Sequence, residues 1–251
     1  VGLGMNGGFC YAKGKPIYVI AKTSSDISTT MANVATKIIF YDKPEDLIEP
    51  FTRIVKSFPR VILASKSAVR KQQLTDNSIP FEVIVSNADE TPDKSKSFKN
   101  QLAEISMRKA RKVLEETKDR GLRLIIAADQ NIVFDNSMYG KPKSRDEAYR
   151  LISSMSGTEE VYAYTGNAIL LAENDNVLQS INITDVARLS VDYISDEEID
   201  NYLKNDNYLS ICGGISINNC SFVHLKEGRM STAKGMTLEY AKEIMSNLNE
   251  C

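Results

Sequence analysis

Asp129 is the candidate functional residue whose position in the sequence is most unusual for a charged side chain. It directly follows residues 124–128, an uninterrupted apolar run of the kind that forms a buried strand. We expect the strand to end at Asp129 and Gln130, so that the carboxylate stands at the carboxyl end of the strand, where open α/β sheets hold their ligands. Such a carboxylate can orient or deprotonate a water molecule, but an Asp that merely caps the next turn explains the pattern equally well.

A second cluster combines hydroxyl and cationic side chains. It follows the short apolar run of residues 61–64 and consists of Ser65, Ser67, Arg70 and Lys71. At a strand-to-helix junction, these donors and the free N–H groups of the helix terminus can surround a phosphate. The alternative is an ordinary serine cap followed by a solvated basic face. The P-loop pattern, GxxxxGK followed by Ser or Thr, does not occur in the sequence.

Two further motifs carry charge on predicted loops. Asp89 and Glu90 follow the predicted strand at residues 81–85 and could hold Mg²⁺ while substrate phosphates complete its octahedron, although such acids are also common in plain turns. Lys141 lies between a glycine and a proline, either as a phosphate ligand or in a surface turn. Together the candidates supply acids for a metal and a water molecule, and cations for phosphates. That combination suits metal-assisted phosphoryl or nucleotidyl chemistry.

Composition excludes several other classes of protein. The 251 residues are 42% hydrophobic and 25% charged, which is enough apolar material for a sizeable core. The net charge of −2 argues against a protein that coats a nucleic acid polymer. No apolar run approaches the roughly 20 residues that cross a bilayer, so we expect no membrane partner and a cytoplasmic location. A single histidine and four scattered cysteines make a zinc site or histidine-based catalysis a poor explanation.

From residue 60 onward the predicted elements alternate between strand and helix. We expect strands at residues 61–64, 81–85, 124–128, 161–171 and 180–191, and helices at residues 65–74, 98–113, 145–155, 195–204 and 237–248. This order is typical of an α/β fold. The two long neighbouring strands in the middle suggest a hairpin and therefore a mixed sheet.

The first 58 residues read differently and predict an N-terminal extension of unknown role. We expect strands at residues 16–21 and 37–41 and a helix at residues 44–57. Residues 2–7 formally match the pattern GxGxxG, but no clear helix follows them. A flexible terminus is therefore a better explanation of this segment than a dinucleotide site.

Eight motifs occur in the order in which the Maf family of nucleoside triphosphate pyrophosphatases carries them. They are LASKSAVR at 63–70, DETP at 89–92, MRKA at 107–110, ADQ at 128–130, GKP at 140–142, SG at 156–157, YTG at 164–166 and SDEEI at 195–199. Residues 59–251 thus resemble a Maf-like domain. The resemblance implies a two-lobed α/β fold, related to that of enzymes acting on deaminated purine nucleotides, with a mixed, elongated central sheet flanked by helices.

The resemblance also implies an activity and roles for particular residues. The expected reaction cleaves a noncanonical or modified nucleotide between its α- and β-phosphates, using Mg²⁺ or Mn²⁺. Asp129 matches the proposed proton acceptor of the family, and Glu90 matches an acid associated with the metal or the water. The residues that match positions around the triphosphate are Ser65, Arg70, Lys109 and Lys141. Related proteins are often dimers, so a homodimer is expected.

Three positions bear on the choice of base. Gln130 and the motif at residues 89–92 are similar to the branch that acts on 7-methyl-GTP, whereas the dTTP/UTP branch usually has Thr after the catalytic Asp. Val69 departs from the Pro-Arg or Pro-Trp of the family, and Asn218 is the nearest counterpart of a Gln or Glu that reads the base. These departures leave alternatives: a dTTP/UTP or ITP/XTP pyrophosphatase, or a catalytically impaired nucleotide-binding protein.

Overall fold

The computed structural model describes residues 17–118, 120–204, 206–218 and 220–248. Its backbone contacts divide the chain into two compact units, with the boundary between Phe58 and Pro59; of the described residues at the other end, 246–248 group with the smaller, N-terminal unit. The GxGxxG match at residues 2–7 lies outside the described residues. Within the described ranges, no helix combines the length and the apolar character needed to cross a membrane.

The smaller unit is built on two parallel strands. β1 (Tyr18–Lys22) and β2 (Lys37–Tyr41) pair in parallel, and α2 (Thr29–Val34) connects them. The sequence did not predict α2, because this short helix buries none of its residues and so shows no apolar periodicity. The predicted helix at residues 44–57 is present, but it opens with the 3-10 turn η1 (Pro44–Leu47) before α3 (Ile48–Ser57) begins.

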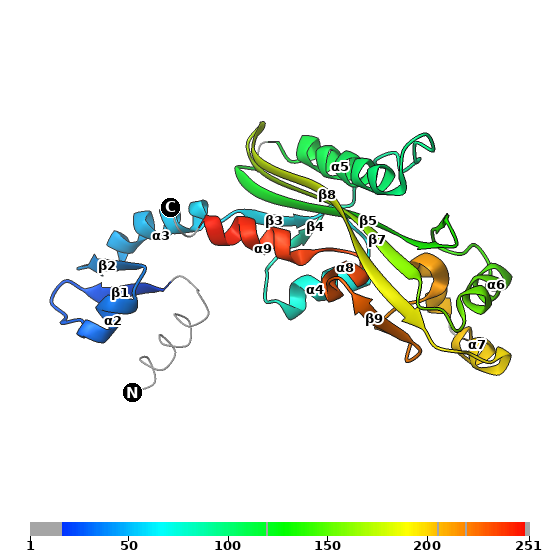
Figure 1. Cartoon of the computed structure of the whole chain (residues 1–251). Helices are drawn as coiled ribbons and strands as arrows, with labels where there is room; N and C mark the ends of the chain where they lie inside the picture. Colours follow the sequence, from blue (N-terminus) through cyan, green and yellow to red (C-terminus); the bar gives the residue numbers. More distant parts are fainter. Residues whose placement is uncertain (1–16, 119, 205, 219, 249–251) are drawn as a thin grey trace. The chain divides into compact units, whose positions relative to one another are not determined.

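The larger unit contains a mixed sheet (Figure 1). Its strands run in the order β4-β3-β5-β7-β8-β9, with β6 paired to the end of β5. Their bounds are β3 (Arg60–Leu63), β4 (Glu82–Val83), β5 (Leu122–Phe134), β6 (Ser137–Tyr139), β7 (Val161–Glu173), β8 (Asn176–Val191) and β9 (Val223–Glu227). β3 is parallel to β4 and β5, and the other pairs are antiparallel. The predicted mixed sheet and its β7–β8 hairpin are confirmed.

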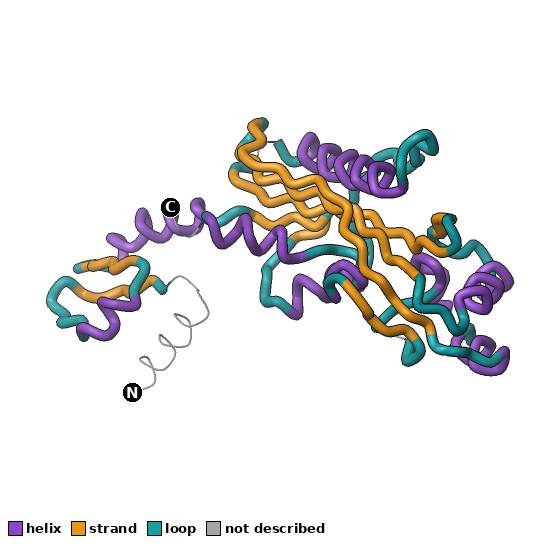
Figure 2. The backbone as a smooth tube through the Cα atoms, viewed as in Figure 1, coloured by secondary structure: helices purple, strands orange, loops and turns teal. Residues whose placement is uncertain are grey.

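Helices flank this sheet, as expected for the fold class (Figure 2). They are α4 (Ala68–Asp76), α5 (Phe98–Glu116), α6 (Arg145–Met155), α7 (Asp196–Tyr202), η2 (Asp206–Ser210), η3 (Cys212–Gly214), α8 (Met230–Ala233) and α9 (Leu238–Asn247). In Figures 1 and 2, α5 lies along one face of the long strands, and α4, α8 and α9 lie on the other. One buried apolar cluster joins α5 to β3, β5 and β7, and another joins α6 and α7 to β5 and β7–β9.

Three boundary predictions were wrong. The strand at residues 124–128 does not end at Asp129: β5 continues to Phe134, because its antiparallel partner β7 pairs with it well beyond the point where β3 ends. The helix predicted from residue 65 begins at Ala68, since Ser67 is its cap. The strand predicted at residues 81–85 is reduced to Glu82–Val83 at the edge of the sheet.

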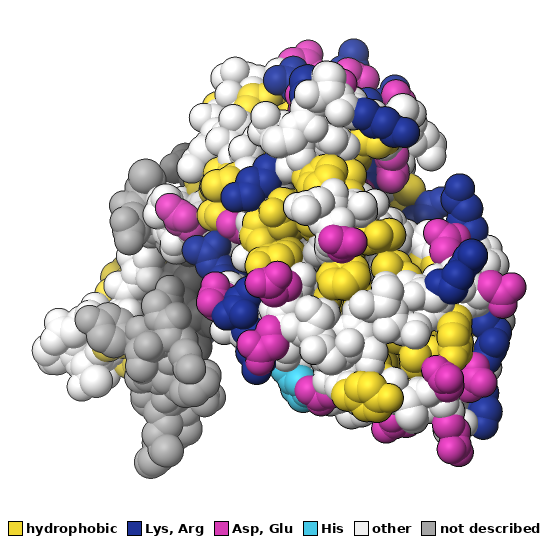
Figure 3. Space-filling model, turned by 45° about the vertical axis from the view of Figure 1, so that its right-hand side comes forward, with side chains coloured by type: hydrophobic (Ala, Val, Ile, Leu, Met, Phe, Trp, Pro, Cys, Tyr) yellow, Lys and Arg dark blue, Asp and Glu magenta, His cyan; other side chains and the backbone are white. Residues whose placement is uncertain are grey.

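Charged side chains of both signs are interspersed over the face of the molecule that Figure 3 shows. This distribution agrees with the small net charge of −2. On this face, binding of an anion would therefore depend on a local grouping of cations rather than on a general basic surface.

Candidate active site

Lys109 lies between two carboxylates at the centre of the candidate site. Its Nζ is 2.6 Å from Oδ1 of Asp129 and 3.0 Å from Oε2 of Glu90. The Lys109 side chain is 8% exposed, whereas Glu90 is largely exposed and Asp129 is 17% exposed. The ammonium group is therefore buried, Asp129 is half-buried, and Glu90 faces solvent. Asp129 Oδ2 accepts no hydrogen bond from any residue that the structure describes.

The close approach of α5 to β7 brings Lys109 to Asp129. In the sheet Asp129 pairs with Gly166 of β7. A Cβ atom at Gly166 would lie 2.3 Å from the carbonyl oxygen of Leu102 and 2.8 Å from Oγ of Ser106, so only glycine permits this contact. Lys109 lies one helical turn beyond Ser106 on the buried side of α5. Gly166 of the YTG motif therefore contributes to the site because it has no side chain, which lets α5 come close to β7.

The guanidinium of Arg70 donates hydrogen bonds to three acceptors, from β5, the segment after β3 and the turn after α8. Nη1 donates to the carbonyl oxygen of Ala128 (2.8 Å) and to Oγ of Ser65 (3.2 Å), and Nε donates to the carbonyl oxygen of Gly235 (2.7 Å). Nη2 has no acceptor among the described residues, which leaves two N–H donors for a ligand. Burial lowers the pKa of the guanidinium, while the charges of Asp129, Cys212 and Glu90 act in the opposite direction. A guanidinium nevertheless remains charged in proteins.

The other residues of the hydroxyl and cation cluster have local roles. Ser67 is the cap of α4, and its hydroxyl accepts a hydrogen bond from the N–H of Arg70. The ordinary explanation of this serine is therefore correct. Ser65 is buried, and its hydroxyl accepts from both Ser67 N–H and Arg70. Lys71 is half-buried in the first turn of α4.

Cys212 lies within the same group of charges, which the sequence did not reveal. Its thiol donates a hydrogen bond to the carbonyl oxygen of Gln130 at 2.8 Å. Burial, with a further contribution from Asp129, raises the pKa of this thiol to about 11, and the positive charges of Arg70, Lys141 and Lys109 act against the rise. The only signal in the sequence was the glycine pair that follows Cys212.

The Lys141 turn is joined to this cluster through its backbone. Gly213 N–H donates to the carbonyl oxygen of Gly140 at 2.8 Å. Gly213 has a φ of 69°, and an added Cβ would lie 2.6 Å from Cγ1 of Ile132. Lys141 itself is exposed, and its charge is felt at Cys212. The GKP turn is thus a surface turn whose lysine still contributes positive charge to the site.

The three residues expected to choose the base are not equivalent in the structure. Gln130 is next to Asp129, and its amide donates to Oγ1 of Thr165 and to the carbonyl oxygens at the end of α8. Val69 is half-buried in the first turn of α4. Asn218 is exposed in a turn, where its N–H donates to Oγ of Ser216. Among the described residues, Gln130 is the one of these three whose backbone contacts the charged cluster, because its carbonyl oxygen accepts from the thiol of Cys212.

The two carboxylates of the site, Glu90 and Asp129, match the donors that a divalent cation takes from a protein. Among the described residues, no group of three or more His, Cys, Asp or Glu side chains is close enough to bind a metal. Mg²⁺ commonly uses only one or two carboxylates and takes its remaining ligands from water and phosphates. Glu90 and Asp129 match that donor set. Because both contact Lys109, a cation bound there competes with the ammonium group for them.

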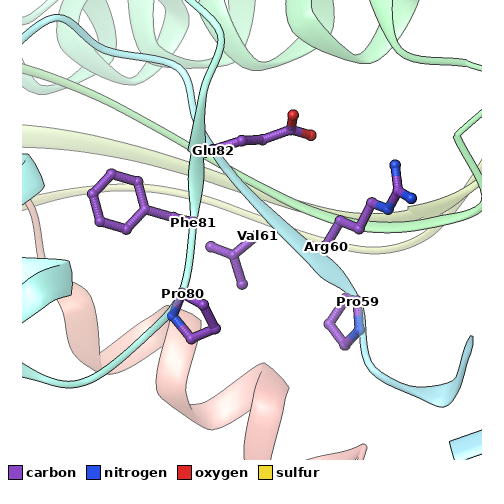
Figure 4. Close-up of a pocket in the computed structure, with 6 residues that line it drawn as sticks. All are labelled: Pro59, Arg60, Val61, Pro80, Phe81 and Glu82. Atoms are coloured by element: carbon purple, nitrogen blue, oxygen red, sulfur yellow. The ribbon is translucent and has the colours of Figure 1, made fainter. Parts of the chain in front are cut away.

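A cavity of about 390 Å³ lies away from this site (Figure 4). It is lined by Pro59, Arg60, Val61, Pro80, Phe81 and Glu82. These residues surround the start of β3, whereas Ser65 and Arg70 follow its end. The cavity therefore takes no part in the chemistry of the candidate site.

Comparisons with known proteins point to one family. The family described as "Maf-like protein" matches residues 60–248. A dTTP/UTP pyrophosphatase of Bdellovibrio bacteriovorus is 27% identical over 75% of this chain and 98% of its own length. A nucleoside triphosphate pyrophosphatase of Prochlorococcus marinus (strain MIT 9215) is 30% identical over 73% of this chain and 97% of its own length.

One solved structure is also similar. It is a nucleoside-triphosphatase / dITP/XTP pyrophosphatase from Mycobacterium abscessus, 12% identical over 76% of this chain and 95% of that chain, with a TM-score of 0.35. A likeness at this level does not discriminate among related folds.

Proposed function

Because the chain belongs to the Maf family, we propose that it hydrolyses nucleoside triphosphates to the monophosphate and pyrophosphate. The observation that carries this proposal is the contact of Asp129 with Lys109, beside an arginine that keeps two donors available. The names of the relatives support it, since they are pyrophosphatases acting on nucleotides. A group of carboxylates and cations without histidine suits this reaction.

The cations of the site bind the triphosphate. Nη2 of Arg70 offers two N–H donors to phosphate oxygens, while Nη1 donates to Oγ of Ser65. Lys109 contributes a buried positive charge beside Asp129 and Glu90, and Lys141 adds charge from the surface. Positive charge placed there offsets the negative charge that develops on the leaving pyrophosphate.

Asp129 is the proposed proton acceptor. Its Oδ1 is fixed by Lys109, while Oδ2 is without a hydrogen-bond partner among the described residues and can receive the proton of an attacking water molecule. Glu90 and Asp129 would hold a divalent cation, Mg²⁺ or Mn²⁺, which supplies neutralising charge to the phosphates when bound.

For the base, 7-methylguanine is the first candidate. Gln130 after the catalytic Asp and the DETP motif at residues 89–92 favour it, through their similarity to that branch of the family. dTTP and UTP are the second candidate, because relatives of this chain carry that name. Val69 and Asn218 depart from both branches, so a broad base preference fits the sequence as well.

A substrate panel tests the proposal. Pyrophosphate release is measured with 7-methyl-GTP, dTTP, UTP, ITP and XTP in Mg²⁺ and in Mn²⁺, for the wild type and Asp129→Asn. We expect Asp129→Asn to lose activity by roughly 10²–10⁴-fold, the usual contribution of a general base. Asp135→Asn is the matched control, since Asp135 is exposed in the β5–β6 turn with a φ of 46° that Asn also adopts.

The results of this panel distinguish an active pyrophosphatase from a nucleotide-binding protein without turnover. Equal rates for wild type and Asp129→Asn would remove the role assigned to Asp129. Tight nucleotide binding without pyrophosphate release in either metal would show a binding protein that has lost turnover. The expected homodimer and the role of residues 1–58 stay predictions, and light scattering on the purified chain checks the first.

A further inference from the structure

The end of helix α8 is surrounded by side chains from the candidate site. Of the four successive carbonyl oxygens from Thr232 to Gly235, only that of Thr232 accepts a backbone hydrogen bond among the described residues, from the N–H of Gly235. Each of the four accepts a hydrogen bond from a side chain of another element. The donors are Gln130 and Thr165 to Thr232, Gln130 to Ala233, Gln73 to Lys234 and Arg70 to Gly235.

The geometry of this turn requires glycine at position 235. The N–H of Met236 donates to the carbonyl oxygen of Ser231, and the N–H of Gly235 donates to that of Thr232, which is the Schellman arrangement. Gly235 has a φ of 88°. An added Cβ would lie 3.0 Å from Oε1 of Gln130 and 3.6 Å from Nε of Arg70. The turn is therefore packed directly against both side chains.

Gln130 uses its whole amide nitrogen to hold the turn. Nε2 carries two hydrogens and lies 3.0 Å from Oγ1 of Thr165, 3.0 Å from the carbonyl oxygen of Thr232 and 3.2 Å from that of Ala233. Successive strand residues point to opposite faces of a sheet, so Gln130 faces α8 while its neighbour Asp129 faces α5. No donor of this amide is left for a nucleotide base.

The 232–235 turn contacts Arg70 and accepts a hydrogen bond from its guanidinium. Of its three recorded hydrogen bonds, the shortest runs from Nε to the carbonyl oxygen of Gly235, at 2.7 Å. Together with the two hydrogen bonds of Nη1, this bond sets the rotation of the planar guanidinium and so the direction in which the two donors of Nη2 point. A shift of the turn would rotate Nη2 away from the phosphates without touching Asp129.

We propose that Gln130, through the 232–235 turn, is a positioning residue for the phosphate-binding Arg70 and does not read the base. The identity of the ligand rests on the proposed function above. The contact between Gln130 and the turn does not, so the two can be tested separately.

Binding of inorganic pyrophosphate, which has no base, tests the inference by calorimetry. Gln130→Met keeps the volume of the side chain and removes both donors. We expect it to weaken pyrophosphate binding about tenfold, which corresponds to about 1.4 kcal/mol, and to raise the KM of every nucleotide by a similar factor. The control is Gln72→Met, an exposed position on α4 whose amide contacts only Asp76 among the described residues. Unchanged pyrophosphate affinity with altered ratios among bases would overturn the inference.

A readout independent of ligand uses the Arg70 Nε–H signal in ¹⁵N NMR, assigned with Arg70→Lys. In the wild type we expect slow hydrogen exchange of this group, because it donates to Gly235. Exchange should be faster in both Gln130→Met and Gly235→Ala, and unchanged in Gln72→Met. Wild-type exchange rates in Gln130→Met would refute the positioning role even for an active enzyme. If the wild type hydrolyses no nucleotide, the proposed function fails, while this measurement still decides the role of Gln130.

Discussion

Replacing Gly166 with alanine tests whether the close packing of α5 on the sheet positions Lys109 against Asp129, the proposed proton acceptor. The added Cβ would lie 2.3 Å from the carbonyl oxygen of Leu102, whereas ordinary contact begins at 3.4 Å. The obstruction is backbone on one side and Ser106 on the other, so the helix must move away by about 1.1 Å. Since Lys109 moves with α5, its distance to Asp129 grows from 2.6 Å toward a value at which the hydrogen bond is lost.

We expect two separable effects of Gly166→Ala. Overpacking of this kind costs about 1–3 kcal/mol of unfolding free energy, which lowers Tm by about 2–4 °C for each kcal/mol in a chain of this size. A displacement of about 1 Å at the reacting groups costs up to about 10²-fold in rate. Thermal unfolding and pyrophosphate release at 25 °C measure the two effects on the same sample.

Gly157→Ala is the matched control. Gly157 has a φ of 75°, and no atom lies within 4 Å of an added Cβ, so alanine there is strained without a clash. We expect it to cost about 1–2 kcal/mol of stability and to leave the rate unchanged. A Gly166→Ala protein that is destabilised like the control but keeps a kcat within threefold of wild type would refute the positioning argument.

Three more predictions follow from single contacts. Arg70→Lys keeps the charge but loses the fork that donates to Ala128 and Gly235, so pyrophosphate should bind about 10–100-fold more weakly by calorimetry, with the exposed Arg111→Lys as control. The thiol of Cys212, with a pKa raised to about 11 from an ordinary 9.0, should react with iodoacetamide about 100-fold more slowly at pH 8 in the folded protein than in urea. Mass spectrometry of the Cys212 peptide measures this, and equal rates would contradict the assigned burial. Hydrogen bonds from the backbone and hydroxyl of Ser195 lower the pKa of Glu198 below its ordinary 4.5. A depressed carboxyl pKa stabilises the folded state above the unfolded value and ceases to do so as pH falls through the folded value. The Tm difference between wild type and Glu198→Gln should therefore be present at about pH 6 and shrink as the pH falls below the ordinary value of 4.5.

Local patterns predicted the types of the larger elements well. The apolar spacing of α5, the capping box at Ser195 and Glu198, and the two long apolar strands of the hairpin are all present. Each of these depends on residues within a single helix or within two strands that follow each other in the chain. The short elements β6, β9 and α8 have too few residues to show a period, and they were not predicted.

The same distinction between local sequence pattern and tertiary packing applies to the candidate site. The sequence by itself determined that a carboxylate follows a buried apolar run at Asp129, and that cations and hydroxyls suited to phosphate gather near other strand ends. The resemblance to the Maf family rests on those same local motifs. The expected burial of a segment and its helix or strand period can be predicted from a short stretch of sequence. The positions of these candidate residues along the elements therefore follow from the order of residues alone.

Only the tertiary structure decided which of these groups meet. Asp129 lies within β5 because β7 continues to pair beyond it, Lys109 reaches Asp129 because Gly166 lets α5 approach, and Gln130 faces α8 rather than a ligand. Each outcome depends on strand register or helix packing between segments tens of residues apart. A local sequence pattern carries no information on that pairing, since register and close approach are set by the packing of whole elements against each other.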